Sequence, residues 1–99
     1  MKNNVILVGR IVSDPQINET ENGSKVCTII IAISRNFRNK DGIYETDFIP
    51  VELYGNIATN TTEYCRKGDV IGVRGIIERL PNEEIKIVAE KISFLTSGK

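Results

Sequence analysis

The residue types with the clearest chemical potential are crowded into one short stretch, SRNFRNKDG, at positions 34–42. Arg35, Arg38 and Lys40 lie around Phe37 there, and an Asp-Gly pair typical of a hairpin turn follows. Cations can neutralise phosphates, and an aromatic ring can stack on an unpaired base at about 1–3 kcal/mol per base. The stretch therefore indicates a surface for single-stranded nucleic acid, a ligand that carries both groups.

Two further rings, Phe48 and Tyr54, lie on the segment IYETDFIPVELYG that follows this turn. They share one face of an alternating pattern, and three aliphatic residues share the other face: Ile49, Val51 and Leu53. Because successive side chains of a strand point to opposite faces, the aliphatic face is predicted to enter the core. Phe48, Tyr54 and Phe37 would then form one outward aromatic face bordered by cations.

Each of these features also has a purely structural interpretation. Single exposed rings are common, and a Phe beside a hairpin can fold back over the end of a barrel. Cations near a turn are often only solvated charges, so it is the three rings beside the densest basic stretch that favour binding. Five scattered cations either line the path or only keep strands soluble: Arg10, Lys67, Arg74, Arg79 and Lys86. All of them except Lys86 are counted as candidate contacts.

The composition argues against catalysis. The chain has no His, so the usual general base for a Ser or Cys nucleophile and the imidazole ligands of metal sites are missing. Cys27 and Cys65 stand in apolar stretches without a CxxC pair, and they are predicted to be buried thiols. We therefore expect no enzyme, no catalytic residue, no metal and no other cofactor.

The net charge requires a local binding face. The 13 basic and 13 acidic residues cancel, so any basic surface depends on acids lying elsewhere. Several acids do fall in other predicted loops: Asp14, Glu19, Glu21, Glu83 and Glu84. No apolar run approaches the about 20 residues that cross a bilayer, and the N-terminus lacks a signal-peptide pattern. A cytoplasmic protein without membrane contact is expected.

The elements that must hold these side chains are mostly strands. Five segments have strand character: 5–12, 26–34, 43–55, 69–77 and 84–95. Residues 13–25 carry turn signals and suit a loop or irregular hairpin. Between 56 and 69 the period changes to that of a short helix, with Asn56 as a candidate N-cap and Gly68 as a candidate stop.

Five strands with one helix between the third and fourth predict an all-β OB-fold, a five-stranded Greek-key barrel. An SH3-like barrel is the main alternative, although it usually lacks a helix there. We expect one domain over residues 1–96 and a loose tail over 97–99. Both faces of segment 5–12 are largely apolar, so this strand is predicted to be covered on both sides, by core or by another subunit.

Three ordered motifs resemble those of bacterial single-stranded DNA-binding proteins: NNVILVGRIVSDPQI, SRNFRNKDGIYETDFIPVELYG and YCRKGDVIGVRGII. The resemblance covers almost the whole chain. It implies an OB-fold, DNA binding without sequence specificity in replication, recombination or repair, and a homotetramer, with a dimer as the alternative. Phe37, Phe48 and Tyr54 match the stacking rings of that family, and Lys67 matches a basic position.

The chain also departs from that family. It contains no Trp, and its last hairpin, ERLPNEE, is short and lacks an aromatic residue. The sequence stops at LTSGK, where the family continues to an acidic tip that recruits repair enzymes. If this is the whole protein, such recruitment is not expected; if it is part of a longer chain, nothing follows from the missing tip. A bacterial short form, or a plasmid-borne or phage-borne version, fits this pattern.

Other functions remain open from the sequence. A primosomal replication protein N-like OB protein also lacks the acidic tail and is usually dimeric. An RNA-binding or protein-binding OB module could use the same aromatic face as a protein hot spot. A carboxylate-dependent nuclease is disfavoured, because nothing in the sequence positions two metal ions.

Overall fold

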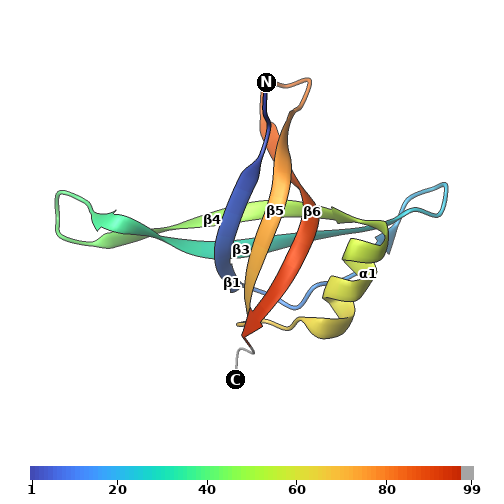
Figure 1. The fold of residues 1–99 in the computed structure, drawn as a ribbon, viewed down its shortest axis with the longest axis horizontal. Helices are drawn as coiled ribbons and strands as arrows, with labels where there is room; N and C mark the ends of the chain where they lie inside the picture. The colour runs from blue at the N-terminus through green and yellow to red at the C-terminus, as the bar shows by residue number, and fades with distance from the viewer. Residues whose placement is uncertain (97–99) are drawn as a thin grey trace.

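The computed structural model describes residues 1–96. Within them lie six strands and one helix (Figure 1): β1 (Val5–Ile11), β2 (Asn18–Glu19), β3 (Lys25–Arg38), β4 (Tyr44–Tyr54), α1 (Gly55–Tyr64), β5 (Val70–Arg79) and β6 (Ile85–Thr96). The five long strands and the helix correspond to those that were predicted, but β3 continues to Arg38, four residues past the predicted end at Ser34. The short β2 belongs to the irregular hairpin expected at 13–25. The tail at 97–99, predicted to be loose, lies outside the described residues.

The long strands close into a barrel. Their order is β1-β5-β6-β4-β3, and β1 returns to pair with β3 through Arg10–Ala32 and Ile11–Ile31. The contact between β4 and β6 is parallel, whereas the other pairings of the described strands are antiparallel. This is the Greek-key barrel of an OB-fold, with α1 between β4 and β5, and it confirms the predicted fold class.

The barrel interior is filled by alternate residues of the long strands. Val51 and Leu53 of β4 are completely buried, and Ile49 packs against them from the edge of the core. Both thiols are buried and free, as predicted. The buried hydrophobic residues are Ile11, Cys27, Ile29, Ile31, Val51, Leu53, Ala58, Cys65, Ile71, Val73 and Ala89. Because one face of β4 is used for this core, its other face must meet solvent or a ligand.

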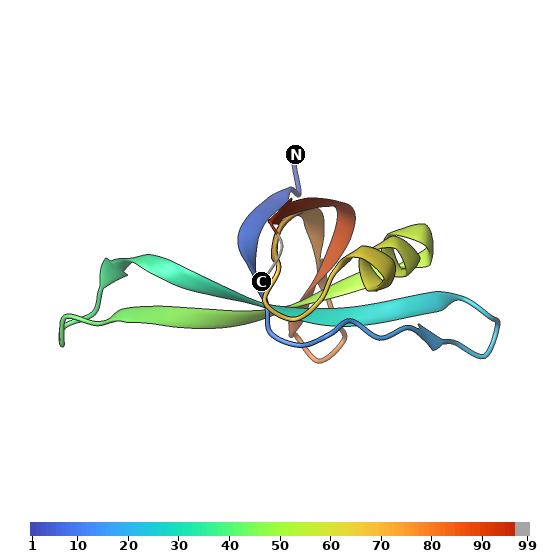
Figure 2. The same cartoon turned by 90° about the horizontal axis from the view of Figure 1, so that it is seen from below.

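Two hairpins project from opposite sides of the barrel and give the molecule its length of 49 Å (Figures 1 and 2). One is the β2–β3 turn. The other is the far end of β3 and β4, where the ladder is regular as far as Ser34–Thr46 and then breaks before Arg38–Tyr44. We call residues 35–45 the arm. Three residues of β3 oppose one of β4 in this gap, so backbone pairing alone does not define the arm.

Gly75 occupies a point of close approach between β5 and β6. The β5–β6 ladder shifts register between Arg74 and Gly75. A Cβ on Gly75 would lie 2.2 Å from the carbonyl oxygen of Val88, a backbone atom that no side-chain rotation can move away. Only glycine therefore fits this point of the β5–β6 contact without a backbone shift.

The helix differs from its predicted ends. It begins at Gly55 with Tyr54 as N-cap, no side chain caps it, and its C-cap is Cys65, so the assignment of Asn56 and Gly68 to these roles was wrong. Gly68 instead adopts a φ of 94° in the turn that follows. The last helical carbonyls are satisfied by Arg66, whose guanidinium donates to the carbonyl oxygens of Thr62 and Cys65.

The first strand is covered on one face only. Leu7 packs against the core and Ile11 is buried, whereas Ile6 and Val8 on the opposite face are 71% and 53% exposed. The sequence predicts that both faces of this strand are covered, by core or by another subunit. Within a single chain, the core covers only one of them. As to membranes, the described part of the chain contains no helix long and apolar enough to cross one.

Candidate nucleic-acid interface

The outer face of β4 presents two rings of the predicted aromatic face. Phe48 is 63% exposed and Tyr54 is 40% exposed, while Val51 and Leu53 between them are buried. The expected alternation is therefore present. The rings are six positions apart along an extended strand, which places them about 20 Å apart at about 3.3 Å per residue. A flexible strand of nucleic acid lying along β4 could meet both rings.

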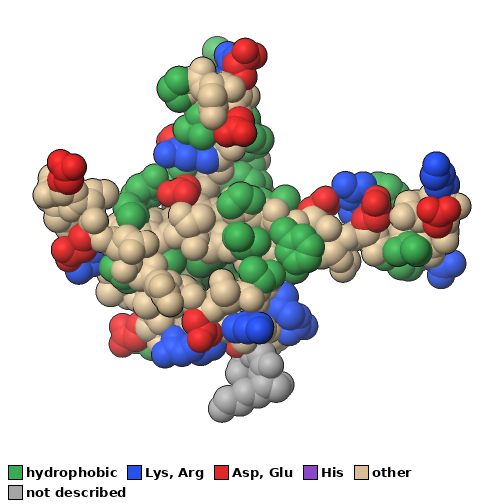
Figure 3. Space-filling model, turned by 180° about the vertical axis from the view of Figure 1, so that it is seen from behind, with side chains coloured by type: hydrophobic (Ala, Val, Ile, Leu, Met, Phe, Trp, Pro, Cys, Tyr) green, Lys and Arg blue, Asp and Glu red, His purple; other side chains and the backbone are tan. Residues whose placement is uncertain are grey.

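The neighbouring strand β3 extends this face with small and apolar residues. Ala32 lies directly opposite Phe48 in the ladder, and Ile30, which is 39% exposed, lies opposite Pro50. Figure 3, which views the molecule from behind, shows hydrophobic side chains gathered over this surface between the two projections. We call Ile30, Ala32, Phe48, Pro50 and Tyr54 the platform. Its exposed rings and apolar side chains suit the faces of unstacked bases.

Tyr54 is held in a polar network. The ammonium of Lys86 donates to the Tyr54 hydroxyl at 3.2 Å and also lies 5.7 Å from the ring centroid. The same hydroxyl donates to Glu52 over 3.4 Å, and Thr28 donates to the other oxygen of this carboxylate at 2.8 Å. The hydrogen bond with Tyr54 is the main reason that the pKa of Lys86 is raised. Lys86 therefore places a positive charge at the end of the platform.

The third ring lies on the arm. Phe37 is 59% exposed and falls in the irregular stretch between the last two β3–β4 pairs, so strand alternation does not assign it to the platform face. Nearby, the guanidinium of Arg38 lies 5.3 Å from the ring centroid of Tyr44, a cation–π arrangement. Tyr44 has the same parity as Phe48 along β4, so this pair continues the platform face onto the arm.

Arg35 does not point to that face. Its Nε and Nη2 donate to the two carboxylate oxygens of Asp47, both at 3.0 Å, and its Nη1 donates to Glu45 at 3.1 Å. Asp47 and Glu45 alternate with Phe48 along β4, which places all three charges on the opposite side of the strand. The hydrogen bond from Arg35 holds the pKa of Asp47 below its ordinary value, and Asp47 raises the pKa of Arg35.

The remaining predicted cations fall into separate groups. Lys40 is exposed near the tip of the arm. Arg10 donates to the Gly68 carbonyl at 2.6 Å, which brings it beside the turn that carries the exposed Lys67. Arg10 is also paired with Ala32, the platform residue opposite Phe48. Arg10 therefore lies beside the platform, and Lys40 lies beyond its Phe48 end, on the arm.

Arg74 and Arg79 belong to β5, which is not one of the two strands that carry the platform. Arg74 pairs with Ile6 of β1 and Lys91 of β6 in the ladder, on the outer surface of the other side of the barrel. Arg79 forms an ion pair with Glu83 at 3.2 Å at the end of the β5–β6 hairpin.

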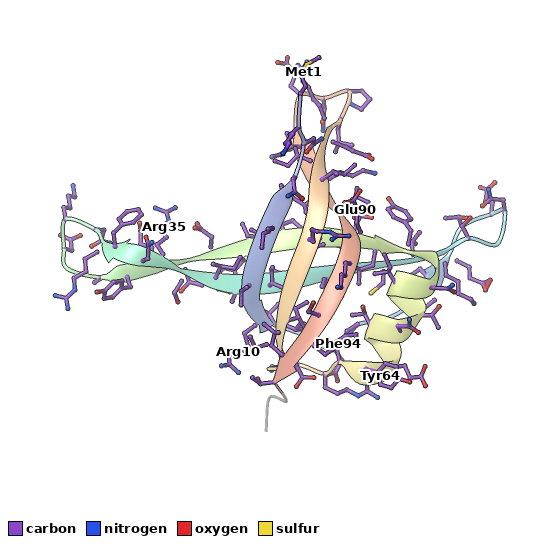
Figure 4. The ribbon with its side chains drawn as sticks, in the orientation of Figure 1. Met1, Arg10, Arg35, Tyr64, Glu90 and Phe94 are labelled. Carbon is purple, nitrogen blue, oxygen red and sulfur yellow. The ribbon has the colours of Figure 1, made fainter. Side chains whose placement is uncertain are left out.

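An aromatic pair that the sequence analysis did not single out lies on the helix side of the molecule. Figure 4 shows its two residues, Tyr64 and Phe94, whose ring centroids are 6.1 Å apart.

The sequence interpretation left several charged groups out of the site. Lys86 was counted among the scattered cations but not among the candidate contacts. No local signal marked it, because the parallel β4–β6 pairing that brings it to Tyr54 joins positions far apart in the chain. Two acids beside the candidate residues, Glu52 and Asp47, were also not considered in the sequence analysis. The alternation of β4 was a sufficient signal for Glu52, which shares the parity of Phe48 and Tyr54.

Comparison with known proteins identifies single-strand binding proteins as relatives of this chain. The chain matches the sequence model of the single-strand binding protein family over residues 2–95. It is 33% identical to single-stranded DNA-binding protein 1 of Clostridium acetobutylicum, over 98% of this chain and 96% of that protein. It is 35% identical to single-stranded DNA-binding protein B of Bacillus subtilis, over 96% of this chain and 91% of that protein. It is 37% identical to a single-stranded DNA-binding protein of Clostridium tetani, over 97% of this chain and 72% of that protein.

Proposed function

Because the chain belongs to the single-strand binding protein family, we propose that it binds single-stranded DNA without sequence preference and protects it during replication, recombination or repair. The observation that carries the proposal is the platform, where Phe48 and Tyr54 stand exposed on an OB barrel. The match to a family of binding proteins also agrees with the expectation that the chain is not an enzyme.

The platform suggests how bases and backbone would be divided between side chains. Bases stack on Phe48 and Tyr54, since any base offers a flat face and stacking needs no particular sequence. Phosphates then lie toward the bordering cations, and their neutralisation releases condensed counterions. The candidate phosphate contacts with the best placement are Lys86, Arg38, Lys40, Arg10 and Lys67. Duplex DNA binds much more weakly, because its bases are already stacked on one another.

Self-association is the second part of the proposal. Residues 5–9 of β1 pair with β5 on one edge only, because β3 reaches β1 no further than Arg10 and Ile11. A free strand edge beside the exposed Ile6 and Val8 suits pairing with β1 of a second copy, which would bury both side chains. We propose a homotetramer built on such pairs, with a dimer as the alternative. Arg74 would then lie near a subunit contact.

The direct test is a titration of the protein with oligo-dT, poly-U and duplex DNA at several salt concentrations. Tight binding to oligo-dT, with the logarithm of the association constant falling by about 0.7 per phosphate contacted for each tenfold rise in salt, supports the proposal. Poly-U reports any RNA preference. Equal affinity for duplex and single strands, or no binding of oligo-dT, would refute it.

A further inference from the structure

We propose that Arg35 is a positioning residue that fixes the arm, and that it makes no phosphate contact; the role of the arm in DNA binding rests on the proposed function. The sequence alone places Arg35 with Arg38 and Lys40 as one basic stretch. The structure separates them, because Arg35 is the member whose guanidinium is bound on the side of β4 opposite Phe48.

The geometry is that of a structural ion pair. Two parallel N–H groups of Arg35 meet the two oxygens of Asp47, the bidentate arrangement that a planar guanidinium forms with a carboxylate. A third N–H donates to Glu45 at 3.1 Å. One cation thus joins two acids of β4 that are two residues apart. The local sum of these charges is −1, so a phosphate approaching this side is repelled.

The place of the contact in the ladder explains why it is needed. Backbone pairing between β3 and β4 is regular up to Ser34–Thr46 and resumes only at Arg38–Tyr44. The side chain of Arg35 extends from β3 at the start of this gap. Asp47 and Glu45 lie on β4, one on each side of Thr46. The side-chain contact therefore bridges the two strands where main-chain hydrogen bonds are interrupted.

The consequence concerns the residues beyond the gap. Phe37, Arg38 and Lys40 can meet DNA in a defined geometry only if the arm keeps a fixed direction relative to the platform. Ordering a loose arm at the moment of binding would cost conformational entropy. Holding it in advance through Arg35 removes part of that cost, so Arg35 supports affinity without touching the ligand.

The first test compares charge-neutralising variants of two acids, Asp47→Asn beside the arm and Asp41→Asn at its turn. Each removes one negative charge near the DNA path, but only the first breaks the bidentate contact, since Asp41 is at the turn and no Arg35 contact involves it. A phosphate-binding Arg35 would be released by Asp47→Asn, which would then bind oligo-dT more tightly than Asp41→Asn. The positioning role predicts the reverse order, with Asp47→Asn several-fold weaker.

The second test compares Arg35→Gln with Lys40→Gln by the salt dependence of oligo-dT binding. Loss of a phosphate contact at Lys40 is expected to flatten the slope by about 0.7. Arg35→Gln is expected to weaken binding and leave the slope of the parent unchanged. If Arg35→Gln flattens the slope as Lys40→Gln does, Arg35 binds a phosphate and the proposal is wrong.

A third measurement needs no DNA and separates the two proposals. In the free protein, the backbone amides of residues 35–46 should exchange hydrogen faster in Arg35→Gln and Asp47→Asn than in the parent, with Asp41→Asn and Lys40→Gln unchanged. Unchanged exchange in the first two variants overturns the positioning role of Arg35. Failure of the parent to bind oligo-dT refutes the proposed function instead, while the exchange result still reports on Arg35.

Discussion

Phe48 and Tyr54 are exposed for the same reason that Val51 and Leu53 are buried. A strand sends successive side chains to opposite faces, so a buried odd-numbered face forces the even-numbered rings outward. The cost of leaving large rings in water is offset only when a partner covers them. At this scale the rings are therefore the most direct indication of a ligand.

Replacing either ring tests this interpretation. We expect Phe48→Ala and Tyr54→Ala each to weaken oligo-dT binding by about 1–3 kcal/mol, because each removes a stacking surface. The melting temperature should change little, since neither side chain is part of the core. Tyr64→Ala serves as the control, because Tyr64 is an exposed ring that packs near Phe94, away from the platform. Wild-type affinity in both platform variants would show that the binding site lies elsewhere.

The two thiols allow a second prediction at the scale of single residues. Burial raises the pKa of Cys27, and burial followed by the charge of Asp69 raises the pKa of Cys65 to about 11. The thiolate is the reactive form, so neither Cys should react with a thiol-specific disulfide reagent at neutral pH until the protein unfolds. Counting labelled thiols with and without denaturant checks this, and labelling of the native protein would contradict it.

The raised pKa of Cys65 also sets the sign of a pH effect. In the unfolded chain this thiol ionises near its ordinary value of 9.0, whereas in the folded chain it stays protonated to about 11. Proton loss therefore favours the unfolded state, and the free energy of unfolding should fall as pH rises through this range. Chemical unfolding of the parent and of Cys65→Ala at each pH isolates the effect, which must be smaller in the variant.

At the scale of elements, departures from regular strand pairing decide where the functional side chains lie. The gap in the β3–β4 ladder releases the arm from the barrel, and the shift at Gly75 lets β6 curve against β5. β6 in turn carries Lys86 to Tyr54. Bulges commonly redirect strands in this way next to functional surfaces.

Gly75→Ala tests the second of these irregularities. An added methyl group would meet the Val88 carbonyl oxygen at 2.2 Å, so the β5–β6 contact must open. We expect a loss of stability of about 1–3 kcal/mol or more, seen as a lower melting temperature. In Gly72→Ala on the same strand, the methyl group has its nearest neighbour at 3.7 Å, an ordinary contact. Equal melting temperatures for the two variants would contradict this account.

At the scale of the whole molecule, the outer face of β1 is an apolar surface that the rest of the chain leaves uncovered. Ile6 and Val8 are exposed beside a strand edge that lacks a partner over residues 5–9. An exposed edge with apolar side chains favours pairing with another chain. The platform lies on another side of the barrel, so DNA binding and self-association need not compete.

The double variant Ile6→Lys, Val8→Lys tests self-association. Lysines on both sides of a subunit contact repel one another and resist burial, so the mass in solution should fall from a tetramer toward smaller species. Light scattering measures this mass directly. Ile85→Lys is the control, because Ile85 is also exposed but lies on the β5–β6 hairpin. A parent that is already a monomer at micromolar concentration would refute the proposed assembly.

Much of the fold could be predicted because the relevant signals are local. Alternation over 44–54, β-branched runs such as VCTIIIAIS and the Asp41-Gly42 turn each act within a few residues. The helix ends were less accessible. Asn56 and Gly68 have suitable residue types, but the chain enters α1 directly from β4 and leaves it through Cys65. A residue type suited to a cap does not determine whether tertiary packing uses it.

The amino-acid sequence by itself determined the succession of strands and helix along the chain, the inward face of β4, the exposure of Phe48 and Tyr54, and the burial of both thiols. It did so because side-chain period and hydrophobicity are properties of neighbouring residues. Only the tertiary structure decided that Arg35 faces Asp47 and Glu45, that Lys86 meets Tyr54, and that Arg74 lies on the far side of the barrel. Those outcomes depend on strand register, bulges and a parallel pairing between distant segments, none of which has a local signal in the sequence.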